Sequence, residues 1–260
     1  MPSKQSDMTL LEFPHSHYCE KVRWALDYKG IPFKAVAILP GLHMITVRKY
    51  APDTSVPVLL SDNEVVQGSS DIISYLEQKY PSHSLTPTDA DQRQTCLEIE
   101  YAMDKRLGEN IRRVLYDGLL AYPEFMRYCF THPMPIVKQL FFRIMYPMLR
   151  YKIYKTYVVS AVKVARARRE FDVAMSEIEQ TLMQRKYLVG ERFTRADLSV
   201  ASMLSLLVMP AEHPFPWREI PDPKTRIFLD EYRDHPVSDW VRKMYQDHRL
   251  NQTSMGSPIR

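Results

Sequence analysis

The sequence predicts an α/β domain of order βαβαββα followed by an all-α helical domain. Two observations support this fold class. Short strand-like apolar runs alternate with amphipathic helical segments as far as Tyr80. Beyond a stretch rich in Pro, Ser, Thr and Asp, long helical patterns recur without a convincing strand. We expect the first domain over residues 1–82, a linker over 83–92 and the helical domain over 93–260.

The elements of the first domain follow from its periodicity. Strands are predicted at "MTLLEF", "FKAVAIL", "VPVLL" and "EVVQ", and helices at 17–29, near 43–49 and from Ser69 to Tyr80. The first strand–helix–strand unit should give a parallel pair, because such crossovers are right-handed and return to the same sheet. The short "LLSDNEVV" connection predicts a hairpin. Together these elements make a four-stranded mixed sheet.

The second domain is predicted to be helical over 91–121, 136–185, 195–208 and 236–247. The loops "AYPEF", "THPMP" and "EHPFPWREIPDP" contain prolines, which interrupt helices. We expect these stretches to separate the long helices.

Composition excludes several classes of protein. The 260 residues are 45% hydrophobic, with 35 basic against 31 acidic side chains, which is too balanced to indicate nucleic-acid binding. Cys19, Cys96 and Cys129 are too widely spaced for a CxxC zinc site or a disulfide framework, so a reducing cytoplasm is the expected location. No apolar leader follows "MPSKQSD", and no apolar run is long enough to span a bilayer.

The stretch "FPHSHYCEKVRWAL" joins the first strand to the first helix. Ser16 is a candidate N-cap, and a hydroxyl at a helix start could also stabilise the thiolate of a bound thiol. A purely structural cap remains an alternative. Cys19 lies in the first helical turn and is either reactive or an inert core residue. We predict no metal site, because His15, His17 and Cys19 straddle a turn where side chains diverge.

Several motifs, in this order, resemble those of the cytosolic glutathione transferases: "SHYCEKVRWALDYKGIPF", "GLHM", "TSVPVLL", "QGSSDIISYL" and "YLVGERFTRADLSVASML". The resemblance covers nearly the whole chain. It implies a thioredoxin-like first domain, a helical second domain, glutathione as cosubstrate and a homodimer. In the last motif, Thr194 should be an N-cap paired with Asp197, and Phe193 and Leu198 should form a hydrophobic staple.

The same resemblance implies roles for individual residues. Ser16 would stabilise the glutathione thiolate, with Tyr18 and Cys19 near enough to replace it. Val56, before a cis Pro57, would align the cysteinyl part, and His43 would lie near the glycyl carboxylate. Ser69 would bind the γ-glutamyl carboxylate, with Ser70 and Gln67 helping to hold the peptide ends.

Departures from the family pattern leave two hypotheses open. Gly68 replaces the usual Glu or Asp, so Gln67 or Asp71 would have to pair with the glutathione amine. Ser55 replaces the usual Lys or Gln, and His17 replaces a common proline. The favoured hypothesis is an enzyme that activates glutathione for attack on a small hydrophobic electrophile, or for a related reduction or isomerisation. The alternative is a noncatalytic adaptor with a degenerate glutathione pocket, which binds a protein partner or a membrane surface through the basic segment 123–169.

The segment 123–169 lies outside the family pattern and is aromatic and basic. Its basic residues include Lys138, Arg143, Arg150, Lys152, Lys155, Lys163, Arg166, Arg168 and Arg169. We favour an extended helical hairpin with a solvated basic face that covers the acceptor pocket. Contact with an anionic membrane or with a partner protein is the less favoured alternative. No nucleic-acid motif accompanies the segment.

The acceptor pocket is expected between the domains, on the helix after the linker. Candidate wall residues are Tyr101, Met103, Leu107 and Tyr116. For any single one of them, ordinary core packing or a dimer interface is the favoured role.

Overall fold

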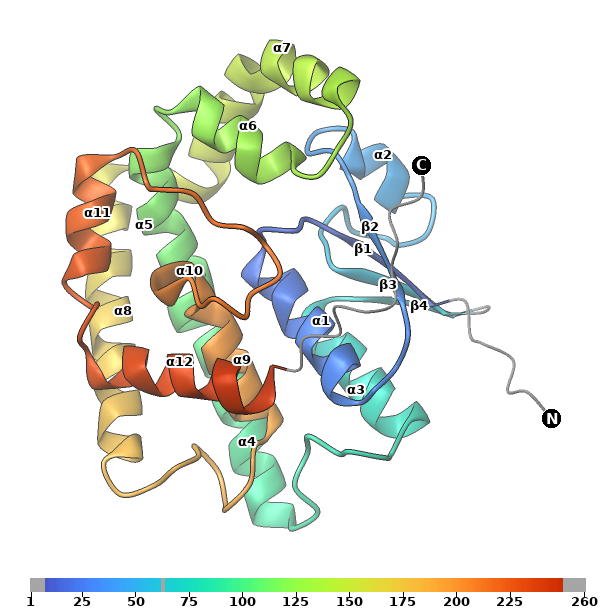
Figure 1. The fold of residues 1–260 in the computed structure, drawn as a ribbon, viewed down its shortest axis with the longest axis vertical. Coiled ribbons are helices and arrows are strands. Elements are labelled where there is room, and N and C mark those ends of the chain that lie inside the picture. Colours follow the sequence, from blue (N-terminus) through green and yellow to red (C-terminus); the bar gives the residue numbers. More distant parts are fainter. Residues whose placement is uncertain (1–7, 62–63, 250–260) are drawn as a thin grey trace.

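The computed structural model describes residues 8–61 and 64–249 (Figure 1). The first domain contains β1 (Thr9–Glu12), α1 (His17–Tyr28), β2 (Lys34–Ala37), α2 (His43–Val47), β3 (Val58–Ser61), β4 (Glu64–Gln67) and α3 (Ser69–Lys79). The strand order is β2-β1-β3-β4. The β1–β2 pair is parallel and the other two pairs are antiparallel. The predicted mixed sheet is confirmed, and the hairpin turn at 62–63 lies outside the described residues.

Alternation along the strands gives the sheet two buried faces. Leu10 and Leu59 belong to the main core, together with residues of α1 and α3. The neighbouring Leu11 and Val58 belong to a smaller cluster that includes Val47 of α2. Because successive strand side chains point to opposite faces, one face carries α1 and α3 and the other carries α2.

The second domain contains helices and no strand in its described part, as predicted. Its elements are α4 (Ala90–Met103), α5 (Asn110–Leu119), α6 (Pro123–Thr131), α7 (Ile136–Ile153), α8 (Ala161–Leu182), α9 (Arg195–Met203), α10 (Ser205–Val208), α11 (Pro223–Asp230) and α12 (Pro236–His248). Two π-helical segments, Asp104–Glu109 and Tyr154–Val158, follow α4 and α7. Among the described residues, no helix is long and apolar enough to cross a membrane.

The helices α6 and α11 lie between the predicted helices, and each begins at a proline of a predicted loop, "AYPEF" or "EHPFPWREIPDP". Each begins with a proline at its first turn, where the missing N–H leaves no helical hydrogen bond unmade. The prolines were therefore helix starts, and taking them only as helix breakers was wrong at both places.

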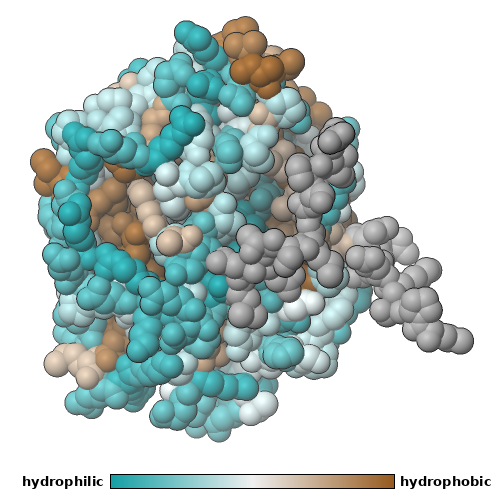
Figure 2. All heavy atoms as spheres, in the orientation of Figure 1, coloured by the Kyte–Doolittle hydropathy of each residue, from teal (hydrophilic) through white to brown (hydrophobic). Residues whose placement is uncertain are grey.

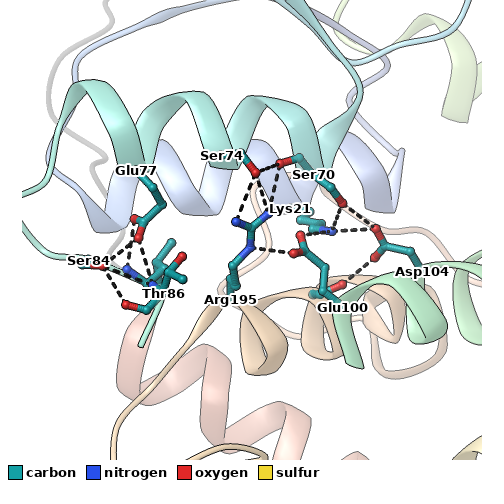
Figure 3. A network of polar contacts seen from close by, with 11 residues as sticks. Lys21, Ser70, Ser74, Glu77, Ser84, Thr86, Glu100, Asp104 and Arg195 are labelled. Atoms are coloured by element: carbon teal, nitrogen blue, oxygen red, sulfur yellow. Dashed lines mark hydrogen bonds and ion pairs between the residues drawn. The ribbon is translucent and has the colours of Figure 1, made fainter. Parts of the chain in front are cut away.

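A buried polar cluster joins the two domains (Figure 3). The Lys21 ammonium of α1 lies 2.7 Å from a Glu100 oxygen and 2.6 Å from an Asp104 oxygen, and its side chain is 0% exposed. The second Glu100 oxygen lies 2.5 Å from Nε of Arg195. Since Lys21 comes from the first domain and its partners from the second, the cluster fixes α1 against α4 and α9.

The capping box predicted at the start of α9 is present. The Thr194 backbone N–H and hydroxyl both donate to one Asp197 oxygen at 2.8 Å. The other Asp197 oxygen accepts from the Leu188 N–H at 2.8 Å. Phe193 and Leu198 are both buried in the main core.

Candidate active site at the domain interface

A pocket of about 240 Å³ lies between the two domains. The first domain contributes Phe13, His15, Ser16, His17, Tyr18, His43, Thr54, Ser55 and Val56. The helical domain contributes Arg112, Leu115, Tyr116, Leu119, Phe125, Met126, Cys129, Tyr157, Leu206, Met209, Trp217 and Ile220. The first wall is largely polar and the second largely apolar, an arrangement suited to a ligand with one polar and one hydrophobic part.

Ser16 lies at the polar wall and caps α1 as predicted. Its backbone is extended, with φ −78° and ψ 125°, and its Oγ accepts a hydrogen bond from the Cys19 N–H at 3.4 Å. The hydroxyl hydrogen therefore remains available to a group in the pocket. The positive end of the α1 helix dipole lies at the same place and favours an anion there.

Tyr18 and Cys19 are placed less favourably for chemistry. The Tyr18 hydroxyl lines the pocket but donates to the Asp104 carbonyl at 2.6 Å, and burial raises its pKa above the ordinary value. Cys19 is fully buried and does not line the pocket, and burial raises the pKa of its thiol to about 12. At neutral pH this thiol is protonated, as expected of an inert core cysteine.

Three histidines line the pocket in the neutral form. Burial lowers the pKa of His15 and of His43 to about 4, and it lowers the pKa of His17 well below its usual value. The Nε2–H of His17 donates to the Gly108 carbonyl at 3.0 Å, and Nδ1 of His43 accepts from the Gly41 N–H at 2.9 Å. These rings add polarity to the pocket without adding charge.

Arg112 carries the one formal charge among the described residues that line this pocket. Its guanidinium lies 4.3 Å from the ring centre of Tyr157 and 5.8 Å from that of Tyr18. Its Nε is buried and has no hydrogen-bond partner among the described residues. A buried donor that no protein group satisfies can be satisfied by an anionic ligand group.

Of the four residues predicted for the acceptor wall, one lines the pocket. Tyr116 lines the pocket, whereas Tyr101 is 65% exposed and Met103 and Leu107 are buried in the core without lining the pocket. The π-helical segment Asp104–Glu109 has a wider turn than an α-helix and shifts the side chains that follow it. Arg112, Leu115 and Leu119 also line the pocket and were not predicted from the sequence. Their spacing i, i+3, i+7 places them on one helix face, and an arginine on this otherwise apolar face was the signal available in the sequence.

The segment before β3 has the predicted conformation. The Val56–Pro57 peptide bond is cis, Val56 lines the pocket and Pro57 is buried behind it. The Gln67 amide donates to the Ser55 carbonyl at 2.8 Å and to the Asp53 carbonyl at 3.1 Å. Gln67 thus positions the loop that carries Val56.

A second hollow lies beside the first and shares Ser55 with it. It is lined by Tyr50, Ala51, Pro52, Asp53, Ser55, Val65, Gln67, Gly68 and Asp71. Gly68 has a φ of +97°, a conformation that favours glycine, and a Cβ built there would lie 3.3 Å from an Asp71 oxygen. The Asp71 carboxylate therefore lies next to Gly68 at the edge of this hollow.

The two predicted serines at the start of α3 are placed apart from the main pocket. Ser69 is buried at the first position of α3, directly after Gly68. The Ser70 hydroxyl accepts from Lys21 at 3.0 Å and donates to Asp104 at 3.1 Å, so it belongs to the interdomain cluster (Figure 3). Neither side chain lines the two hollows.

The described residues contain no group of three or more His, Cys, Asp and Glu side chains placed to hold a metal ion. His15 and His17 line the pocket, whereas Cys19 is buried and does not line it.

Comparison with known proteins shows which family has this arrangement. The glutathione S-transferase N-terminal domain family matches residues 10–84, and the C-terminal domain family matches residues 137–219. A glutathione S-transferase 1 from Dianthus caryophyllus is 38% identical over 125 residues, 47% of this chain and 55% of the relative. A maleylpyruvate isomerase from Ralstonia sp. is 37% identical over 90 residues, 34% of this chain and 42% of the relative. The matches thus span about half the length of these relatives.

Solved structures extend the likeness over the whole fold. A glutathione S-transferase from Methylobacterium radiotolerans, in complex with glutathione sulfonate, superposes with a TM-score of 0.57 at 25% identity, covering 98% of this chain and 100% of that one. One from Rhodospirillum rubrum superposes with a TM-score of 0.63 at 20% identity, covering 97% and 95%. With a mixed four-stranded sheet, a helical second domain and matches to both family domains, this chain belongs to the glutathione S-transferase family.

Proposed function

We propose that this chain is a glutathione-dependent enzyme that activates the glutathione thiolate at Ser16. The thiolate attacks a hydrophobic electrophile, or adds reversibly to a double bond in an isomerisation. One observation carries the proposal: the Ser16 hydroxyl caps α1 in the polar wall of a pocket whose other wall is largely apolar. The likeness to relatives named glutathione S-transferase supports glutathione as the cosubstrate.

Glutathione would lie across both hollows, passing Ser55. The backbone of Val56 would pair with the cysteinyl unit, and His43 would lie near the glycyl end. The γ-glutamyl end would reach the start of α3, where Ser69 offers its N–H and Asp71 offers a carboxylate to the amine. Asp71 suits this role better than Gln67, because the Gln67 amide is occupied by Asp53 and Ser55. Ser70 would support the site indirectly through its bond to Asp104.

The chemistry requires the thiol to lose its proton before attack. The Ser16 hydroxyl would donate a hydrogen bond to the sulfur, which favours thiolate over thiol. The helix dipole of α1 and the positive charge of Arg112 act in the same direction. Among the described residues that line the pocket around Ser16, none is a carboxylate that would oppose them.

In a substitution, the new S–C bond forms as the leaving group departs with its bonding electron pair. In an isomerisation, the electron pair of the double bond moves onto the acceptor as the S–C bond forms. After rotation about the resulting single bond, that pair re-forms the double bond and the glutathione thiolate leaves again.

The acceptor would be hydrophobic and carry an anionic group. Leu115, Leu119 and Phe125 offer apolar surface, and the unpartnered Nε of Arg112 offers a donor to a carboxylate. The relative named maleylpyruvate isomerase is named for a carboxylate, which supports this class of acceptor.

Two substitutions at Ser16 test the thiolate role. Ser16→Ala should lower the turnover number by about 10- to 100-fold and raise the pKa of the bound glutathione thiol, measured by its thiolate absorbance. Ser16→Thr keeps both the hydroxyl and the N-cap and should retain most of the activity. An unchanged pH–rate profile in Ser16→Ala would exclude the role.

Calorimetric titration with reduced glutathione and with S-hexylglutathione tests the binding site separately. We expect one ligand per chain and weaker binding in Ser69→Ala. If neither ligand binds, the noncatalytic adaptor becomes the better hypothesis.

Homodimerisation and a cytoplasmic location belong to the same proposal. The three buried free cysteines, Cys19, Cys96 and Cys129, suit a reducing compartment.

A further inference from the structure

The helix α7 has an apolar face on each side. Phe142, Tyr146 and Leu149 are buried against the rest of the domain. On the opposite side Val137, Leu140, Ile144, Met148 and Tyr151 are 73%, 53%, 79%, 57% and 66% exposed. We call these five residues the outer stripe. Because successive residues of an α-helix are about 100° apart around its axis, the five residues of the outer stripe lie within roughly 80° of arc, on the side opposite the buried residues.

The outer stripe places five exposed hydrophobic side chains along one side of α7. Figure 2 shows hydrophobic side chains gathered at the top of the molecule, where Figure 1 places α7. Scattered single hydrophobic residues are normal on a protein surface, whereas a contiguous stripe along a whole helix marks an interaction site. The basic side chains expected on this segment are exposed at the flanks of α7, whereas the outermost side of the helix is apolar.

Basic side chains flank the outer stripe on both sides. From Phe125 to Arg169 the sequence has ten Lys or Arg residues and no Asp or Glu. Arg143 and Arg150 lie on one flank and Lys138 and Lys152 on the other, all of them exposed. Arg143 lies 4.0 Å from Glu124, and among the described carboxylates none forms an ion pair with the other three. A partner of complementary chemistry is therefore apolar at its centre and negatively charged around it.

We propose that α7 binds an anionic lipid bilayer, lying in the plane of the surface with the outer stripe in the headgroup–acyl boundary. Helices of this kind carry apolar residues on one face and Lys and Arg beside them. The basic flanks would contact anionic headgroups, which attract each Lys or Arg near the surface. Lys152 has its ammonium 3.3 Å from Sδ of Met44 in α2, so the first domain adjoins this end of the helix.

Co-sedimentation with large unilamellar vesicles tests the proposal on the full chain. Vesicles of phosphatidylcholine and phosphatidylglycerol in a ratio of about 3:1 should bind at least about tenfold more tightly than pure phosphatidylcholine vesicles. Raising NaCl from about 0.05 M to about 0.5 M should weaken binding severalfold. The double variant Ile144→Ser/Met148→Ser should lose at least about tenfold in partition coefficient.

A matched control is available elsewhere on the surface. Met183 and Ile227 are 77% and 62% exposed, and Met183→Ser/Ile227→Ser should bind vesicles within about twofold of the unchanged chain. Glutathione titration and the thermal midpoint of each variant, both without vesicles, report any loss of fold or site. Failure of the glutathione site would leave vesicle binding intact, so the two proposals can fail separately.

Three results would overturn the proposal. Equal binding to neutral and anionic vesicles would remove the role of the basic flanks. Concentration-dependent self-association that is lost in Ile144→Ser/Met148→Ser, without vesicle binding, would assign the outer stripe to a second copy of the chain. Binding to polyglutamate, but to no vesicle, would assign it to an acidic protein.

Discussion

Arg112 gives the pocket its charge, and its position controls what the pocket can accept. The neighbouring rings of Tyr157 and Tyr18 hold the guanidinium by cation–π contacts and leave its Nε without a hydrogen-bond partner among the described residues. Arg113, the next residue, donates to the Tyr157 carbonyl at 2.6 Å and does not line the pocket. Two adjacent arginines thus have different roles, one toward the ligand and one within the fold.

Arg112→Gln should discriminate between charged and neutral acceptors. For an electrophile that bears a carboxylate, we expect kcat/KM to fall by about 10- to 100-fold, because a charge-assisted hydrogen bond is lost. For a neutral aromatic electrophile such as 1-chloro-2,4-dinitrobenzene the loss should be less than about fivefold. Steady-state kinetics with both acceptors measures this, and Arg112→Lys should recover part of the loss. Equal losses for the two acceptors would contradict a role in carboxylate binding.

The sequence predicted the polar wall of the site better than the apolar wall. Ser16, His43 and Val56 belong to local motifs next to β1, α2 and β3, so their placement follows from short-range structure. The apolar wall depends on where α5 points after the π-helical segment Asp104–Glu109, and on the helix α6. Neither feature has a strong local signal, because π-helical turns and proline-initiated helices depend on the packing around them.

At the scale of single elements, the start of α9 is held by a buried carboxylate. Asp197 accepts three hydrogen bonds, from the Leu188 N–H and from the N–H and hydroxyl of Thr194. Burial raises the pKa of Asp197 to about 6, so the carboxylate is ionised above that pH. Its hydrogen bonds tie the preceding loop to the helix.

Asp197→Ala should lower the free energy of unfolding by about 2–4 kcal/mol, because three buried donors lose their acceptor. Urea denaturation at pH 7.5 measures this. Asp239 also lies in the first turn of a helix, α12, but its side chain is 69% exposed. Asp239→Ala should cost less than about 1 kcal/mol. If both variants lost the same amount, burial of the α9 cap would not be the cause.

At the scale of the whole molecule, several buried groups make stability depend on pH. His213 has a side chain that is 0% exposed and lies 3.9 Å from a Glu20 oxygen. Burial nevertheless lowers its pKa to about 4. The unfolded chain binds a proton near the ordinary pKa of 6.5, and the folded chain does so only near 4. Stability from this group is therefore present above about pH 6.5 and is lost as the pH falls toward 4.

His213→Gln should flatten the acid limb of the stability curve. Between pH 7 and pH 5, one such histidine accounts for a loss of about 2 kcal/mol in the free energy of unfolding. Between these pH values, the free energy of unfolding of His213→Gln should fall by about 2 kcal/mol less than that of the unchanged chain. Urea denaturation at both pH values measures this difference. His83→Gln, at an exposed position, should keep the unchanged difference. A steeper loss in His213→Gln would show that the imidazole is charged in the fold.

The cluster of Lys21, Glu100, Asp104 and Arg195 bears on how domains of this fold can be exchanged. Lys21 is fully buried at an interface to which the other domain brings two carboxylates, and Glu100 lies between two cations. A chimera that joined the first domain to a helical domain lacking Glu100 and Asp104 would bury an uncompensated ammonium, at a cost of about 3–5 kcal/mol. Recombination between distant relatives would therefore give a stable protein only when the residues that carry these charges are exchanged together. The two domains would then be inherited as a pair.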